Sequence, residues 1–158
     1  MQTDKTDDKD RYFHYKEIRE KYPRIWPLQE ATVYAALAIP VLFGALILHT
    51  FVSVVLFPER QSVFDTYVFA FLLLAGAWTA AACGALHVAV FQRMNREERQ
   101  KTGRYVLPAF SYYEYSDNRR GYIANTVFNT VLMAFLLLVA VGLTAAIAID
   151  FPGEITVE

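Results

Sequence analysis

The residues of this sequence that are best suited to chemistry are polar side chains embedded in long stretches without charge. Tyr34, His87, Asn125 and Asn129 lie near the ends of three such stretches, and we expect them at a similar depth in a membrane. The functional interpretation is a proton relay or a small-ligand site, for example beside a quinone headgroup. The structural interpretation is a set of hydrogen bonds between helices. Both interpretations remain open from the sequence.

The other histidines do not complete a metal or haem site with His87. About thirteen residues of helix, or about 20 Å, separate His49 from His87 along the membrane normal, so the two cannot share one haem or metal ion. His49 or His87 as a single axial ligand, or as a ligand shared with a partner chain, is a weaker alternative. The only cysteine is Cys83, and His14 lies outside the uncharged stretches. The sequence therefore predicts no metal site and no cofactor, with haem or quinone contact as the alternative.

No catalytic motif accompanies these residues. The chain has no HExxH, GxSxG, Walker A or GxGxxG sequence. The uncharged stretches contain no acidic or basic residue, which argues against an ion pump or a voltage sensor built from this chain alone. We therefore expect a protein that is not an enzyme.

Three uncharged stretches determine the fold class. Residues 31–57, 66–91 and 121–149 are 27, 26 and 29 residues long, and none contains Lys, Arg, Asp or Glu. A helix of about 20 apolar residues crosses the hydrocarbon core of a bilayer. The sequence predicts an all-α integral membrane protein with three transmembrane helices in a small bundle. A soluble enzyme, a secreted disulfide scaffold and a disordered tail are excluded.

Basic residues predict the orientation of these helices. Seven of the fifteen Lys and Arg residues lie in residues 1–30 and seven in residues 92–120, whereas the short loop 58–65 carries only Arg60. By the positive-inside rule, residues 1–30 and 92–120 are cytoplasmic, or on the matrix-like side of an organellar inner membrane. The loop 58–65 and the short acidic tail 150–158 are then on the outer side. The prediction is a multi-pass protein of a prokaryotic plasma membrane or an organellar inner membrane, with its N-terminus inside.

The cytoplasmic N-terminal segment is expected to form a short amphipathic helix from Asp7 or Asp8 to about Tyr22. Its apolar positions recur at spacings of three and four, and Trp26 follows at the membrane boundary. We expect this helix to lie on the membrane surface or against a partner. The residues that would form this interface are Tyr12, Tyr15, Ile18, Tyr22 and Trp26.

The loop 92–120 is basic and rich in tyrosine. The helix of residues 66–91 is expected to continue to about Lys101 and to end near Gly103. Beyond it, interleaved tyrosines and arginines predict contact with lipid headgroups or with a partner protein rather than with nucleic acid. The candidate residues are Arg104, Tyr112, Tyr113, Arg119 and Arg120.

Small residues predict how the helices pack. Gly76, Ala80 and Gly84 are four residues apart, which places them on one face of the second spanning helix. Such a ridge lets helix backbones approach closely, either within the chain or between subunits.

These features favour a non-catalytic accessory or structural subunit of a larger membrane complex. Its partners would be membrane lipids and other membrane protein subunits. The alternative is a homo-oligomeric channel, small transporter or ligand-binding protein, in which the polar cluster lines a path. A subunit of a redox complex with a membrane histidine as ligand is the weaker alternative.

Overall fold

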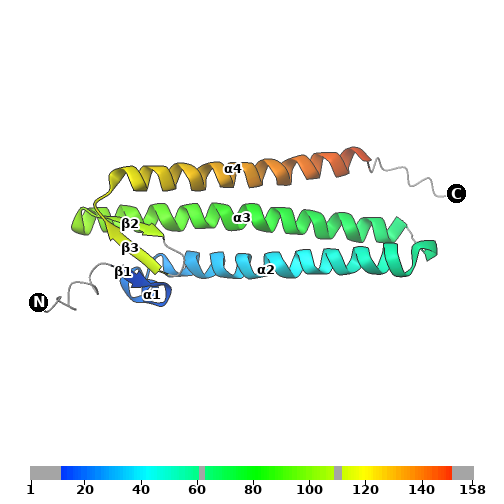
Figure 1. The fold of residues 1–158 in the computed structure, drawn as a ribbon, viewed down its shortest axis with the longest axis horizontal. Coiled ribbons are helices and arrows are strands. Elements are labelled where there is room, and N and C mark those ends of the chain that lie inside the picture. The colour runs from blue at the N-terminus through cyan, green and yellow to red at the C-terminus, as the bar shows by residue number, and fades with distance from the viewer. Residues whose placement is uncertain (1–11, 61–62, 109–111, 151–158) are drawn as a thin grey trace, which may run out of the picture. The chain divides into compact units, whose positions relative to one another are not determined.

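The computed structural model describes residues 12–60, 63–108 and 112–150, most of which are helical (Figure 1). The uncharged stretches lie in three long helices: α2 (Trp26–Thr50), α3 (Val63–Thr102) and α4 (Arg119–Asp150). A π-helical segment, η2 (Phe51–Leu56), continues α2, and a 3-10 turn, η3 (Pro58–Arg60), follows it. By length and composition, three helices of the described chain are suited to cross a membrane, as the sequence predicts.

The described chain forms two compact units. The first, which we call the head, combines the described residues up to Thr32 with Gly84–Leu132. The second, which we call the apolar unit, combines Val33–Cys83 with the described residues from Met133 onward. Each of the three long helices contributes residues to both units.

In the apolar unit, α3 lies between α2 and α4 (Figure 1). Ala77 and Ala81 of α3 are buried in one cluster with Ala140 of α4. On α3, a Cβ atom added to Gly76 would meet the Phe43 ring of α2 at 3.4 Å. Small side chains therefore allow α3 to approach both neighbouring helices closely.

Most large apolar side chains of the apolar unit remain exposed. Phe64 and Phe71 of α3 and Leu138 of α4 are examples. Exposed apolar surface of this extent suits contact with lipid tails or with the helices of another protein.

Helix α3 extends beyond its uncharged part. The helix continues past Phe91 to Thr102, as the sequence predicts, and ends at Gly103. Gly103 has a φ of +77°, which glycine adopts without the steric penalty of a Cβ atom. Three side chains of this extension, Met94, Asn95 and Glu98, are buried in the head.

The head also contains a three-stranded antiparallel sheet, so the expectation of an all-α fold is wrong outside the long helices. Its strands are β1 (Tyr12–His14), β2 (Tyr105–Pro108) and β3 (Tyr112–Ser116), in the order β1-β3-β2. In the register, Phe13 lies opposite Tyr113, and Val106 lies opposite Tyr115. Aromatic and β-branched residues are typical of strands, which explains why the tyrosine-rich loop forms a sheet.

The expected N-terminal amphipathic helix is a second correction. In its described part, β1 leads into a 3-10 turn, η1 (Tyr15–Glu17), and then into a single helical turn, α1 (Ile18–Lys21). Phe13, outside the predicted apolar stripe, is fully buried, and its ring centroid is 5.3 Å from that of Tyr113. Pairing with β3 buries an aromatic side chain that the helix would leave outside its apolar face, so tertiary contact overrides the local periodicity. The predicted start at Asp7 or Asp8 lies outside the described residues.

One hydrophobic core holds the head together. It joins the N-terminal segment, the sheet and the extension of α3 in a single cluster of buried side chains. Its members are Phe13, Ile18, Tyr22, Ile25, Val90, Met94, Val106 and Tyr113. Segments that are far apart in the sequence therefore form one folded unit at the ends of the long helices.

Candidate functional site

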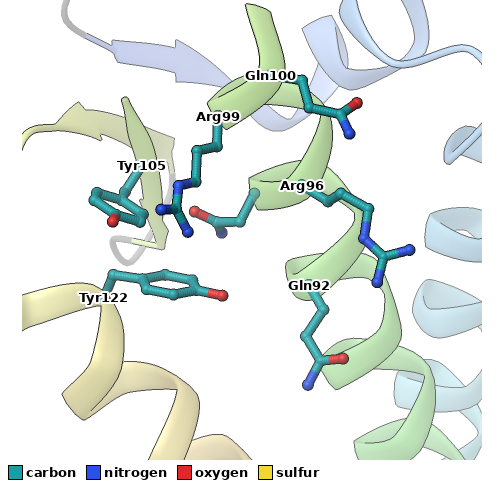
Figure 2. Close-up of a pocket in the computed structure, with 7 residues that line it drawn as sticks. Gln92, Arg96, Arg99, Gln100, Tyr105 and Tyr122 are labelled. Atoms are coloured by element: carbon teal, nitrogen blue, oxygen red, sulfur yellow. The ribbon is translucent and has the colours of Figure 1, made fainter. Parts of the chain in front are cut away.

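A polar cavity opens in the head beside the extension of α3 (Figure 2). Its volume is about 470 Å³, which is within the usual range of small-ligand sites. The lining residues are Gln92, Asn95, Arg96, Arg99, Gln100, Tyr105 and Tyr122. The cavity therefore presents two guanidinium groups, three amides and two phenols.

The helical repeat of α3 supplies most of this lining. Gln92, Arg96 and Gln100 are four residues apart, and Asn95 and Arg99 repeat the same spacing. Side chains at this spacing share one helix face. The two tyrosines come from β2 and from the start of α4, so the cavity exists only when the three elements are assembled.

Stacked aromatic rings form one wall of the cavity. The ring centroids of Phe91 and Tyr122 are 5.8 Å apart, and those of Tyr122 and Tyr105 are 4.7 Å apart. The Cζ atom of Arg99 lies 5.7 Å from the centroid of the Tyr105 ring, within the range of a cation–π contact. Figure 2 shows the guanidinium group of Arg99 beside this wall. Stacking thus connects α3, β2 and α4 at the cavity.

The cavity has an uncompensated positive charge. Within the described chain, neither Arg96 nor Arg99 forms an ion pair, and none of the seven lining residues is acidic. The acids of the same helix segment have other partners. Glu97 lies 3.7 Å from Lys101, and Glu98 accepts hydrogen bonds from the hydroxyls of Tyr22 and Thr102. This arrangement favours an anionic ligand.

Asn95 fixes the position of β2 against α3. Its side chain is 2% exposed, and its Nδ2 donates to the backbone oxygens of Phe91 at 3.0 Å and Val106 at 2.9 Å. Its Oδ1 accepts from the backbone N–H of Val106 at 2.8 Å. A buried amide with this many hydrogen bonds specifies one register between helix and strand.

A second buried contact joins the N-terminal segment to α3. The hydroxyl of Tyr22 donates to Oε2 of Glu98 at 2.6 Å, and both side chains are buried. The pKa of Tyr22 is raised well above its ordinary value, mainly because burial disfavours the phenolate and also because Glu98 accepts its proton in a hydrogen bond. Burial likewise raises the pKa of Tyr113, to about 12. Both phenols therefore remain neutral at physiological pH.

Two of the four polar residues predicted to cluster inside the membrane are joined directly. On α4, Nδ2 of Asn129 donates to Oδ1 of Asn125. His87 lies on α3 in the same unit, is partly buried, and makes no hydrogen bond with the described residues. Tyr34 belongs to the apolar unit, where it is 64% exposed.

His49 lies in a separate polar site in the apolar unit. Its Nε2 is 3.0 Å from the backbone oxygen of Asp65, and Oγ of Ser53 donates to Oδ1 of Asp65 at 3.5 Å. These residues border a cavity of about 230 Å³. Asp65 was expected in the outer loop, but α3 begins at Val63, so Asp65 stands in the first helical turn, where a carboxylate is favoured by the helix dipole.

The residues predicted to face lipid or a partner divide into two groups. Ile18, Tyr22 and Tyr113 form part of the head core, so their side chains are used within the chain itself. Tyr12 and Tyr112 remain on the surface, with ring centroids 5.5 Å apart. Of the others, Tyr15 and Trp26 are partly buried against the head core, and Arg104, Arg119 and Arg120 are exposed.

The predicted small-residue ridge is divided between the two units. Gly76 and Ala80 belong to the apolar unit, where Gly76 is buried near Phe43 and Ala80 is partly buried. Gly84 is the first α3 residue of the head and is partly buried.

Neither a metal centre nor a known relative identifies the protein. Within the described residues, no group of three His, Cys, Asp or Glu side chains lies close enough to hold a metal ion. Comparison of the chain with protein-family models, curated proteins and solved structures finds no match.

Sequence reasoning missed the polar cavity. The spacing of Gln92, Arg96 and Gln100 was a usable signal, because it places three polar side chains on one face of the extended helix. That spacing alone fits a solvated helix equally well. Tyr105 and Tyr122, which close the cavity, are brought to it only by the sheet and by α4.

Proposed function

We propose that this chain is a non-catalytic accessory subunit of a larger membrane protein complex. It would span a prokaryotic plasma membrane or an organellar inner membrane three times, with the sheet and the extension of α3 beyond Phe91 on the cytoplasmic or matrix-like side. The observation that carries the proposal is the pair Asn125 and Asn129 on α4. Among the described residues, their mutual hydrogen bond is the one side-chain hydrogen bond that either amide makes.

The depth of these amides makes their remaining hydrogen-bonding capacity costly. Asn129 lies eight residues after Gly121, which is about 12 Å along the helix. At that distance from the start of the uncharged stretch, Asn129 would lie within the hydrocarbon core, whose thickness is about 30 Å. After the mutual bond is made, one donor of Asn129 and both donors of Asn125 find no acceptor among the described residues. A polar group on a partner helix would satisfy them at this depth.

The neighbouring threonines support this interpretation. The hydroxyl of Thr126 donates to the backbone oxygen of Tyr122, and that of Thr130 donates to the backbone oxygen of Thr126. These side chains use the carbonyls of their own helix and need no partner. Asn125 and Asn129 lie on the same helix but make no such bond to its carbonyls. They therefore provide the candidate contact with another subunit.

The sheet of the head would supply the extramembrane part of the same interface. Tyr12 and Tyr112 stand next to each other on the exposed side of β1 and β3. Exposed tyrosines on a well-packed support are typical of protein–protein contacts, because they bury much surface and lose little conformational entropy.

The experiment is extraction of the chain from its native membranes in a mild detergent, followed by a native gel and mass spectrometry of the band. We expect the wild-type chain in a large complex with defined partners. Substitution of Asn125 and Asn129 by Leu should release the chain, because Leu leaves the partner's polar group unsatisfied. Substitution of Thr126 and Thr130 by Val is the matched control and should leave the complex intact.

Three outcomes would contradict the proposal. A wild-type band of the isolated 18.0 kDa chain would exclude a complex. Multiples of that mass alone would favour a homo-oligomeric channel or binding protein, in which Asn125 and Asn129 contact a second copy. Normal assembly of the Asn125→Leu/Asn129→Leu variant with loss of a transport activity would favour a small transporter.

A further inference from the structure

The polar cavity of the head lies where the apolar part of the chain ends. Phe91 is the last residue of an uncharged stretch, and Gln92, the next residue, lines the cavity. Tyr122 is the second residue of another uncharged stretch and lines it from α4. From Gln92 to Gln100 the helix rises about 12 Å, whereas the headgroup layer of a bilayer is about 5–7 Å thick. In a chain whose long helices span a membrane, the cavity would therefore extend through the headgroup layer.

The charged groups of the cavity match a phosphate. Arg96 and Arg99 have no carboxylate partner within the described chain, and a guanidinium group binds phosphate oxygens with two parallel N–H donors. The adjacent acids, Glu97 and Glu98, are held by Lys101 and Tyr22 and do not line the cavity. Figure 2 shows the two guanidinium groups directed to different sides, with Arg99 beside Tyr105 and Tyr122. The exposed side chain of Arg96 would turn to reach an anion held by Arg99, without competition from these carboxylates.

The remaining lining suits the rest of a lipid headgroup. Gln92 and Gln100 present amides that can donate to ester and hydroxyl oxygens. Figure 2 shows the hydroxyl of Tyr122 directed toward α3, below the guanidinium group of Arg99. Tyrosine is favoured at the headgroup level because its ring is apolar and its hydroxyl is polar.

We infer that this cavity binds the phosphate of an anionic phospholipid headgroup through Arg96 and Arg99. A soluble phosphate ester offers the same anion, but the position of the cavity at the end of two apolar stretches favours a ligand whose acyl chains continue into the membrane. The inference requires that the long helices span a membrane and is independent of any partner subunit.

The test is native mass spectrometry of the full-length, delipidated chain in detergent, titrated with dioleoyl phosphatidylglycerol or dioleoyl phosphatidylcholine. We expect one phosphatidylglycerol to bind more tightly than phosphatidylcholine. The Arg96→Gln/Arg99→Gln variant should lose about a hundred-fold in affinity for phosphatidylglycerol, since each charge-assisted hydrogen bond to the phosphate contributes about ten-fold. Both side chains are exposed, so the variant should keep the head folded, which amide hydrogen exchange of residues 105–108 checks.

A matched control distinguishes binding in the cavity from non-specific attraction between arginines and an anionic lipid. Arg119→Gln/Arg120→Gln removes the same charge from exposed positions at the start of α4 that do not line the cavity. This variant should retain the wild-type preference for phosphatidylglycerol. An equal loss in both double variants, or equal binding of the two lipids by the wild type, would overturn the inference. Binding of glycerol 3-phosphate as tightly as of phosphatidylglycerol would overturn the assignment to a lipid.

Discussion

Asn95 is the residue on which the position of β2 against α3 depends. Its amide makes hydrogen bonds to both backbone groups of Val106. In an Asn95→Ala variant these two buried groups lose their partners, and we expect the head to lose about 3 kcal/mol of stability. Amide exchange at Val106 would then become about 100-fold faster. Arg93→Ala, at an exposed position of the same helix, is the control and should change little. Unchanged exchange at Val106 in the Asn95 variant would contradict this role.

Tyr22 gives the head a dependence on alkaline pH. An unfolded tyrosine ionises at about pH 10, whereas burial holds the pKa of Tyr22 well above that value. Above about pH 10 the unfolded chain therefore binds fewer protons than the native head, and stability falls as pH rises. Below about pH 10 this contribution is fully present.

A Tyr22→Phe substitution tests this dependence. The variant should be about 2 kcal/mol less stable at neutral pH, because the buried Glu98 loses a hydrogen bond. Above about pH 10 its stability should fall less steeply than that of the wild type, by about 1.4 kcal/mol per pH unit. Denaturant unfolding at about pH 9 and about pH 11 measures both effects. Tyr112→Phe, at an exposed position, should behave as the wild type; a wild-type slope in the Tyr22 variant would refute the assignment.

At the scale of elements, the sequence predicted what depends on composition alone. An uncharged run of 26 to 29 residues indicates a spanning helix whatever surrounds it. The end of α3 was also predictable, because Gly103 marks it locally. The sheet was not, since β1 becomes a strand only by pairing Phe13 with Tyr113, one hundred residues later in the chain. The periodicity around Ile18 was real, but the buried side chains face a sheet rather than a membrane or a partner.

The candidate site also has parts that the sequence predicts and parts that depend on tertiary contacts. The polar face of Gln92 and Arg96 is visible in the helical spacing, but Tyr105 and Tyr122 join it only through tertiary contacts. The hydrogen bond between Asn125 and Asn129 follows from their i, i+4 spacing on one helix.

The packing of α3 on α2 in the apolar unit depends on Gly76. Ala at this position would stand 3.4 Å from the Phe43 ring, an ordinary contact, so Gly76→Ala should be tolerated. Gly76→Leu would force the ring or the helix to move and should lower the midpoint of thermal unfolding in detergent by several degrees, as expected for about 1–3 kcal/mol of overpacking. Gly142→Leu is the matched control, because nothing lies within 4 Å of its added Cβ atom. Equal melting of the two Leu variants would contradict close packing at Gly76.

For the whole molecule, the distribution of basic residues and the chemistry of the cavity both favour an orientation with the cavity at the cytoplasmic leaflet. The basic residues that set the predicted orientation include Arg96 and Arg99, which line the cavity. The leaflet with the larger negative surface potential is the cytoplasmic one. A head that faces the cytoplasm would therefore place its phosphate-binding groups against the leaflet that is richest in anionic lipid.

This orientation can be tested with single cysteines. After Cys83→Ala, a cysteine at Glu154 should react with a membrane-impermeant maleimide in intact cells, because the acidic tail is predicted to lie outside. A cysteine at Asp117, whose side chain is 86% exposed in the head, should react only after permeabilisation. The expectation follows from the positive-inside rule, because fourteen of the fifteen Lys and Arg residues lie in the segments predicted to be cytoplasmic. The opposite labelling pattern would place the head outside, and Arg96 and Arg99 would then face the leaflet with less anionic lipid.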